Sequence, residues 1–389
     1  MSPHPLTSQR GAATLAITLM LAFVVLLSVA FANRSMLFEA KTSANQYHAA
    51  QAYEAAEAGL DWALVQLNSN TPIGDDCLPN TGSAATLFRE RSMAQMQAAC
   101  LERDGGWSCR CPLTGEPPAA DEAGVPTFVI RLAAAEQPGL LQLTSTGRSN
   151  GASGSRAQVH VLLGRLPGLD TLPAAALTVR GVPSFGAGTF GVYNTAPAGG
   201  GLTMHSSGTI DTAPLHLVST PGTPATASVI ADDPALAQLT AQGLFASMFR
   251  MDKAAWRTQP AVRELGCESA CDAVLAQLVG SPVTQPLVWL RGGLRLDSAT
   301  VLGSPEHPVL LVADGPVELH AGAVIHGVVY GTAASWTDTA SAAVHGAVIL
   351  EGDLQATGST QIHHNNAVLQ ALHDRTGSYA RVPGSWRDF

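Results

Sequence analysis

The stretch AATLAITLMLAFVVLLSVAFA, residues 12–32, decides how this chain is organised. It contains 21 residues and no charge. A helix of that length spans roughly 30 Å, the thickness of the hydrocarbon core of a bilayer. It follows a short polar segment that ends in Arg10-Gly11. The remainder of the chain is polar and rich in turn-forming residues, so we expect a membrane-tethered chain that carries a water-soluble body.

The composition favours a β-rich body. The chain has 389 residues, enough for two or three domains, with 38 Gly, 24 Pro and only 5% aromatic residues. Its formal net charge is −9. A chain poor in Lys and Arg lacks the basic face that nucleic acids require, so we expect no nucleic-acid partner. The predicted fold class is α+β, with a long N-terminal helix followed by a mainly β region.

Three interpretations compete for residues 1–32. A cleaved secretory signal has a shorter apolar core than this one, although Ala30-Phe31-Ala32 resembles a small-x-small cleavage site. A plain single-span anchor is the second interpretation. The third is a prepilin leader, in which the polar segment is removed and the apolar helix stays on the protein.

The sequence after residue 32 favours a helix that continues beyond the membrane. Residues 33–68 contain no Pro and are rich in Ala, Glu, Gln and Leu, which are good helix formers. Apolar residues recur at helical spacing along one face. One helix is therefore predicted from about residue 13 to residue 67, and such a stiff rod suits a subunit whose rods bundle together in a filament. The apolar face comprises Tyr53, Ala56, Leu60, Ala63, Leu64 and Leu67.

Two motifs carry a resemblance to a known family. Gln9-Arg10-Gly11 precedes the apolar run, and Tyr53–Leu60 reads YEAAEAGL. Together they resemble the N-terminal region of PilX-type minor pilins of bacterial type IV pili, over about residues 1–70. The resemblance implies cleavage after Gly11 by a prepilin peptidase and methylation of the new N-terminus, Ala12. It also implies residence in the inner membrane with the body in the periplasm, then assembly with minor and major pilins into a pilus or a type II secretion pseudopilus.

Two positions depart from the pattern of major pilins. Those proteins begin the mature chain with Phe or Met, and they carry Glu at the fifth mature position. This sequence has Ala12 and Ala16 at these positions. In the family the carboxylate pairs with the N-terminus of a neighbouring subunit. A subunit without it suits the tip of a filament or its initiation.

The cysteines predict disulfides. Their number is even, and four of them lie between residues 77 and 111. A body exported behind a membrane segment meets an oxidising compartment. Zinc is the alternative, but the C-x-C and C-x-x-x-C spacings fit zinc poorly. We expect pairing within each cluster, with the partners in the first cluster left open. The six candidates are Cys77, Cys100, Cys109, Cys111, Cys267 and Cys271.

A small pilin-like head is expected next. Residues 84–103 are predicted to form a short helix, and strands are predicted at Thr127–Leu132, Leu140–Thr146 and Ala157–Leu163. The expected division of the chain is a leader at 1–11, a long helix at 12–68 with its transmembrane part at 12–32, the head at 69–165 and a second domain at 166–389.

The second domain is predicted to be a β-solenoid. The triads Ile325-His326-Gly327, Val344-His345-Gly346 and Ile362-His363-His364 recur at spacings of 19 and 18 residues. Such a period, with short apolar runs and Gly-rich corners, is typical of stacked coils. The runs Leu294–Leu302 and Val309–Ala313 would be preceding coils, and fragments at 178–230 would be earlier ones still. Residues 234–280 are predicted to be a helical insertion.

Catalytic patterns are not found in this sequence, and no cofactor is expected. The three repeated histidines could bind a metal, but a residue that recurs in every coil is more often part of a structural ladder. The leading hypothesis is a non-enzymatic minor pilin at the pilus tip or in pilus initiation, with an adhesive role and a tip adhesin as a further partner. The alternative is a membrane-anchored β-helix protein that binds carbohydrate or acts as a polysaccharide lyase. A lyase needs clustered acids, and the acidic residues near the repeats are sparse: Asp297, Asp314, Glu318, Glu351 and Asp353.

Overall fold

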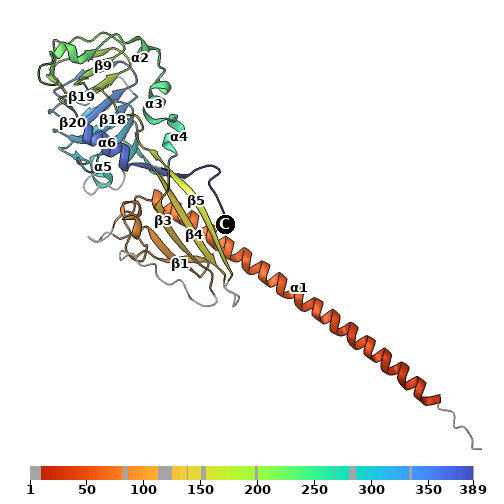
Figure 1. Cartoon of the computed structure of the whole chain (residues 1–389). Coiled ribbons are helices and arrows are strands. Elements are labelled where there is room, and N and C mark those ends of the chain that lie inside the picture. The colour runs from red at the N-terminus through yellow and green to blue at the C-terminus, as the bar shows by residue number, and fades with distance from the viewer. Residues whose placement is uncertain are drawn as a thin grey trace, which may run out of the picture.

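The computed structural model places a long helix, an antiparallel head and a body of parallel strands in succession (Figure 1). It describes residues 10–80, 82, 86–112, 125–137, 139–149, 155–197, 200–267, 269–279, 286–332 and 335–388, with side chains from Ala13 onward. Residues 1–9 of the predicted leader lie outside the described residues.

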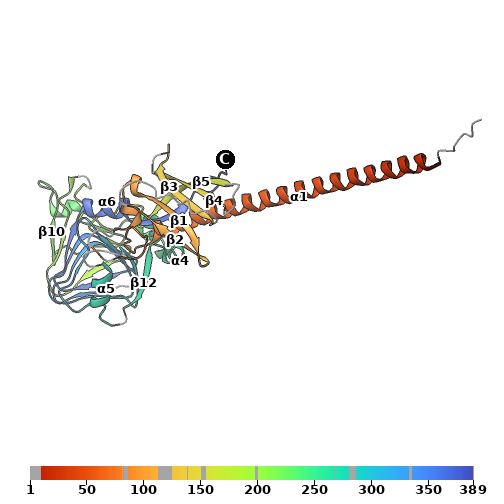
Figure 2. The same cartoon turned by 90° about the horizontal axis from the view of Figure 1, so that it is seen from below.

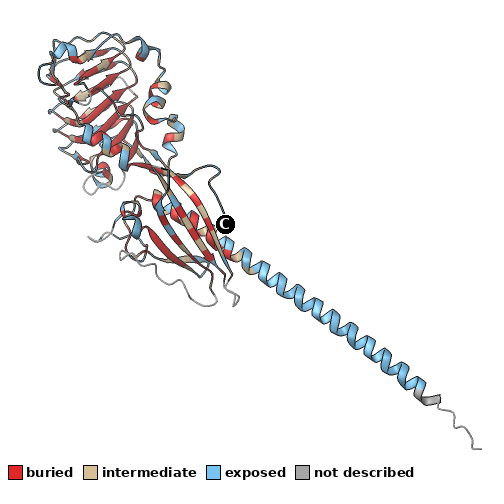
Figure 3. Ribbon diagram, viewed as in Figure 1, coloured by how far each residue is buried: buried red, intermediate tan, exposed pale blue. Residues whose placement is uncertain are grey.

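The helix α1 runs from Arg10 to Asn68 without interruption. At 1.5 Å per residue its length is about 90 Å. We call it the rod. Its N-terminal half is exposed on all sides, and its C-terminal half packs on the head (Figure 3). The predicted helix over residues 13–67 is therefore confirmed.

The head is a six-stranded antiparallel sheet in the order β2-β1-β3-β4-β5-β23. The three strands predicted from the sequence are confirmed as β3, β4 and β5. β23 comes from the far end of the chain and pairs with β5, so one strand of the predicted second domain, residues 166–389, lies in the head sheet. The bounds are β1 Gln97–Arg103, β2 Gly106–Arg110, β3 Thr127–Ala134, β4 Leu140–Arg148, β5 Arg156–Pro167 and β23 Gly377–Arg381.

The predicted helix at residues 84–103 is wrong. Its described residues form two short 3₁₀ turns, η1 Phe88–Glu90 and η2 Met93–Gln95, followed by β1. β1 lies between β2 and β3, and it is cross-linked to β2 by a disulfide between Cys100 and Cys109. Pairing on both edges outweighs the helix propensity of its Ala, Gln and Leu residues.

All six cysteines form disulfides within their predicted clusters. Cys77 bonds to Cys111, Cys100 to Cys109, and Cys267 to Cys271. Arg91 fixes the loop around the first bond, because its guanidinium donates to the carbonyl oxygens of Cys111, Ile73 and Gly74 at 2.9–3.2 Å. Burial lowers the pKa of Arg91.

The rod meets the head through small residues. Ala52 and Ala56 of α1 are fully buried against the sheet. A Cβ atom at Gly147 of β4 would lie 2.0 Å from the carbonyl oxygen of Ala52, and one at Gly59 of α1 would lie 2.2 Å from Oγ of Ser145. Only glycine permits these approaches. The two glycines therefore set the distance between the rod and the sheet.

Beyond the head, short strands stack in parallel along two sheets. We call residues 177–376 the coiled body, because the chain returns to the same strand position on each pass. The first sheet follows β10 Leu215–Val218, β8 Phe190–Tyr193, β22 Gln361–His364, β20 Ala343–Leu350, β18 Val324–Gly331, β16 Val309–Asp314, β13 Leu287–Arg291 and β12 Val262–Gly266, with β6 Leu177–Val179, β9 Met204–Ser206, β11 Val229–Ile230 and β15 Val301–Leu302 beside this path. The second sheet follows β14 Leu294–Leu296, β17 Val317–Leu319, β19 Ser335–Asp338, β21 Leu354–Thr357 and β7 Pro183–Phe185.

The spatial order of the passes differs from their order in the chain. β6, β7 and β8 pair with β20, β21 and β22. Residues 177–230 therefore extend the stack beyond residue 364. The prediction that these residues precede residue 287 in the stack is wrong. The chain reaches the outer passes first, returns along the outside through helices and β12, and then coils outward again. The repeat period of the sequence shows which passes resemble one another, but it does not show the order in which the passes stack.

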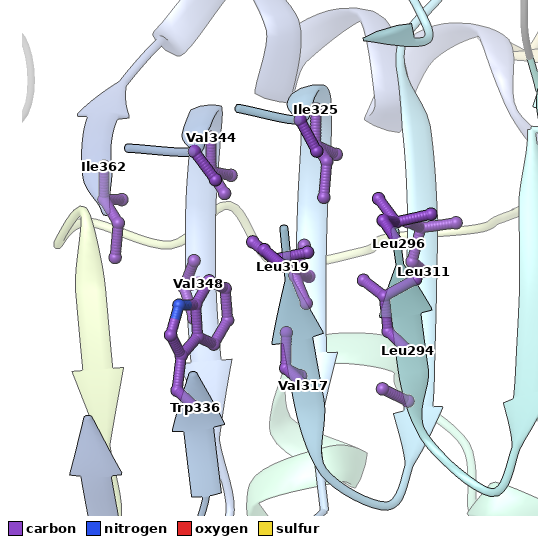
Figure 4. Close-up of a cluster of buried hydrophobic side chains, with 14 of the residues drawn as sticks. Leu294, Leu296, Leu311, Val317, Leu319, Ile325, Trp336, Val344, Val348 and Ile362 are labelled. Atoms are coloured by element: carbon purple, nitrogen blue, oxygen red, sulfur yellow. The ribbon is translucent and has the colours of Figure 1, made fainter. Parts of the chain in front are cut away.

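Two apolar layers hold the coiled body together. Inward side chains from successive strands form one continuous cluster, which Figure 4 shows in part. Outward side chains of β13, β16, β18 and β20 are covered by helices. The predicted insertion at 234–280 supplies three of these helices, and its fourth helix, Asp272–Val279, packs on the inward cluster through Leu275 and Val279. The insertion also contains the strand β12, so its helical assignment is wrong at Val262–Gly266. The helices are α2 Pro234–Gln238, α3 Ala241–Phe249, α4 Lys253–Arg257, α5 Asp272–Val279 and α6 Asn366–Arg375, with a 3₁₀ turn, η4, at Ala225–Ser228.

The substitution Gly147→Val is expected to lower the free energy of unfolding by about 3 kcal/mol, because the added atoms overlap the backbone of the rod. Gly164→Ala in β5 is the matched control, since its Cβ would lie 3.5 Å from Leu140, an ordinary contact. Denaturant unfolding of the detergent-solubilised chain measures both. Equal stability of the two variants would show that the close approach does not fix the rod.

Candidate functional site

The exposed half of the rod is the largest apolar surface on the described part of the chain. Within α1, residues 13–68 include a window of mean hydropathy 2.7 that is 0% buried, and this is the one described helix long and apolar enough to cross a membrane. A contiguous apolar surface of this size marks contact with lipid or protein. Its large exposed side chains are Leu15, Ile17, Leu19, Met20, Leu21, Phe23, Val24, Val25, Leu26, Leu27, Val29 and Phe31.

The few polar side chains in this stretch satisfy themselves within the helix. Oγ1 of Thr18 donates to the carbonyl oxygens of Thr14 and Leu15 at 3.0 Å, and Oγ of Ser28 donates to that of Val24 at 2.8 Å. The stretch therefore needs no external partner for these hydroxyls in an apolar medium. Ala16 adds only a methyl group. The predicted processing residues Gly11 and Ala12 lie within α1, where the structure describes their backbone alone.

The base of the rod is fastened by residues from the far end of the chain, which the sequence analysis did not identify. Nε1 of Trp386 donates to Glu57 at 2.7 Å, and Arg381 pairs with Asp61 at 2.6 Å. Asn68 exchanges two hydrogen bonds with the backbone of Tyr379. The contacts join segments more than 300 residues apart, and no local pattern predicts them.

The repeated histidines form a ladder on the coiled body. His326, His345 and His363 lie in register on β18, β20 and β22, and Tyr193 of β8 continues the row. The ring centroids are 4.9, 5.0 and 4.3 Å apart in that order, with interplanar angles of 16°, 19° and 8°. The rings therefore stack face to face along the strand spacing.

This stacking does not suit a metal ion. Histidines that bind one zinc ion direct their nitrogens toward a common point about 2.0 Å away, whereas these rings stack face to face in a row. Among the described residues, no group of three or more His, Cys, Asp or Glu side chains is placed to hold a metal. The ladder is instead a packed row. Burial lowers the pKa of all three histidines, and the neighbouring His345 lowers the pKa of His326 and His363 further.

The acidic residues near the repeats all contact partners within the structure, and Asp297 and Glu318 share Arg295. Glu351 is buried, and it accepts hydrogen bonds from Nζ of Lys253 and from the hydroxyl of Tyr330, both at 2.6 Å. Burial raises the pKa of Tyr330, and the neighbouring Glu351 carboxylate raises it further. The network ties α4 to β18. The others bind Arg295, a backbone amide or a hydroxyl: Asp297 and Glu318 pair with Arg295, Asp353 accepts from the amide of Val182, and Asp314 accepts from Thr332.

Apolar side chains of the predicted insertion form part of the core. Leu244, Phe245 and Phe249 of α3 are buried against the outward face of the first sheet, and Met248 and Met251 pack beside them. Phe245 contacts the rings of Trp256 and Tyr330 edge to face. The cluster therefore fastens the helical cover to the coiled body.

Acid is expected to destabilise the coiled body through the ladder. A histidine whose folded pKa lies below its unfolded value of about 6.5 binds more protons when unfolded, so the stability present above that pH is lost as the pH falls. The substitution His345→Gln should reduce the fall in the free energy of unfolding between about pH 7.5 and about pH 5. His216→Gln is the control, because its ring lies tilted against Tyr193 at the end of the row. Unchanged pH dependence in His345→Gln would contradict the assignment.

Comparison with known proteins finds a family similarity for the rod. Residues 10–61 match the family model described as PilX N-terminal. Among solved structures, the competence-associated pilin ComZ from Thermus thermophilus is similar, with 13% sequence identity, 88% of this chain and 97% of that chain covered, and a TM-score of 0.26. That score is too low to define a common fold. No curated protein matches the chain.

The family match covers the motif Tyr53–Leu60 and the whole exposed apolar surface. It does not extend to the head sheet or to the coiled body. Over residues 10–61 this chain is similar to the PilX N-terminal family, which confirms the predicted PilX-type resemblance for the rod.

Proposed function

We propose that this chain is a non-enzymatic minor pilin that takes part in type IV pilus assembly at the tip or in initiation. The observation that carries the proposal is the rod, which is apolar and exposed over residues 13–31 and matches the PilX N-terminal family. An apolar surface that is exposed on all sides needs lipid or neighbouring helices around it. The rods of other minor and major pilins supply such neighbours.

The apolar helix first holds the precursor in the inner membrane. Arg10 favours a cytoplasmic leader under the positive-inside rule, so the body lies in the periplasm. A prepilin peptidase then cleaves after Gly11, and Ala12 is methylated. The helix passes from the bilayer into the filament, where its apolar surface packs on neighbouring rods at the same low dielectric.

The tip position rests on size and on one missing charge. The coiled body projects beyond the head at the end opposite the exposed rod (Figures 1 and 2). A body of this size hinders the packing of neighbouring subunits around it in the wall of a filament. Ala16 also lacks the carboxylate that pairs with a subunit ahead in major pilins. A subunit with nothing ahead of it needs no such contact, and its outward body is free to meet a surface or a tip adhesin.

Mass spectrometry of the mature protein tests the processing. Expressed with a prepilin peptidase and its methylating activity, the chain should begin at methylated Ala12. The variant Gly11→Val should keep the leader, while Ser8→Ala, a nearby change away from the cleavage site, should be processed normally. An intact Met1, or an N-terminus near Asn33, would contradict the pilin assignment in favour of an anchor or a secreted protein.

Imaging of assembled filaments tests the position. Gold-labelled antibody against the coiled body should mark filament ends. Labelling spaced along the shaft would contradict a tip role and leave a shaft subunit as the explanation.

A further inference from the structure

The outermost pass of the coiled body is incompletely covered. β10 pairs with β8, and β11 pairs with β9, and no described strand lies beyond either. Leu215 and Leu217 of β10 are only partly buried, whereas their register partners on β8, Phe190 and Val192, are 3% and 0% exposed. The apolar interior of the stack is therefore open at this end. Figure 2 shows β10 at the end of the molecule away from the rod.

The backbone N–H and C=O groups of β10 point away from the stack at alternate residues. The amide of Asn194 donates to the carbonyl oxygen of Val218 at 2.8 Å, so His216 and Val218 direct their peptide groups toward β8. The peptide groups of Leu215 and Leu217 then point away from the stack. The amide of Leu215 is used in a turn to Thr212, and the amide of Leu217 lies on the open side. An edge of this kind is a template for one more strand.

The surroundings of the edge select against a second copy of the chain. Residues 181–249 contain no Lys or Arg, and Asp211 and Asp232 are exposed beside the open pass. Two such ends would repel one another. Prolines 214, 221 and 224 flank the short edge strands and limit the length of any ladder. A single extended segment with positive charge at its ends avoids the charge repulsion, and it needs only the short ladder that the prolines allow.

We propose that this edge, made by β10 and β11, binds an extended segment of a partner protein, which adds a strand to the stack. Its alternate residues are apolar and complete the cover over Leu215 and Leu217. Lys or Arg at its ends faces Asp211 and Asp232. Main-chain hydrogen bonds to the edge strands supply affinity, and the apolar side chains at alternate residues of the segment supply specificity. The proposal rests on the coiled body alone and does not depend on the tip role.

The direct test uses the full chain in detergent with the peptide KTVTVTVTK as probe. Hydrogen exchange measured by mass spectrometry should show new protection in fragments that span β10 and β11 and no change in β13 and β16. The peptide KTVTPTVTK is the matched control, because its proline removes a ladder donor. Equal protection by both peptides, or protection absent from β10, would overturn the proposal.

Two variants separate the parts of the site. Leu217→Pro removes the outward amide and should weaken binding about tenfold, while Leu217→Val keeps it and should bind nearly as wild type. Unchanged exchange protection of β8 in Leu217→Pro verifies that the fold is intact. The double variant Asp211→Asn with Asp232→Asn should weaken binding of the peptide and reduce the salt dependence of its affinity. The backbone groups of the edge strands stay unchanged in this variant. Binding unaffected by all of these changes, or self-association that Leu217→Pro abolishes, would show that the edge serves no charged partner segment.

Failure of the proposed strand addition at β10 and β11 can be distinguished from failure of the pilin assignment. A chain that retains Met1 yet binds the probe at β10 supports the open edge and contradicts the proposed processing. A methylated Ala12 with no protection at β10 gives the opposite result. The two proposals therefore stand or fall on separate measurements.

Discussion

The close approach between the rod and the head sheet is the contact on which the rest of the molecule depends. Gly147 brings β4 against the backbone of α1, and Gly59 lets the side chains of Ser145 and Phe128 approach the helix closely. This contact turns a helix that would be unstable alone in water into a rigid extension of the body. Half of the helix can therefore remain uncovered, ready for lipid or other helices, while the other half fixes the direction in which the body projects.

Patterns that are local in the sequence predicted local structure well. The apolar run at 12–32 and the helical spacing to Leu67 predicted the rod, and alternation predicted β3, β4 and β5. The predictions failed where pairing with strands distant in the sequence determines the secondary structure. Residues 97–103 carry helix-forming side chains, but pairing with β2 and β3 makes them a strand. Val262–Gly266 become a strand because β13 offers them an edge.

The same limit applies to the candidate site. The apolar surface of the rod and the row of histidines could be predicted, since each is a repeat or a run in one segment. The fastening of the rod by Trp386 and Arg381 could not, because it joins residues 329 and 320 positions apart. The open edge at β10 was also beyond reach. It depends on residues 177–230 stacking on the last pass of the coil, an order that the repeat alone does not specify.

The fastening of the rod has a consequence for how the protein is made. β23 is the sixth strand of the head, and Trp386 is bonded to the base of the rod. During synthesis the helix emerges first, and the segment that closes the head emerges after the whole coiled body. A nascent chain thus holds an unfinished sheet edge on β5 until its last residues are made. Chaperones that shield such edges would act during this interval, and chains cut short before residue 377 would be left open to proteolysis.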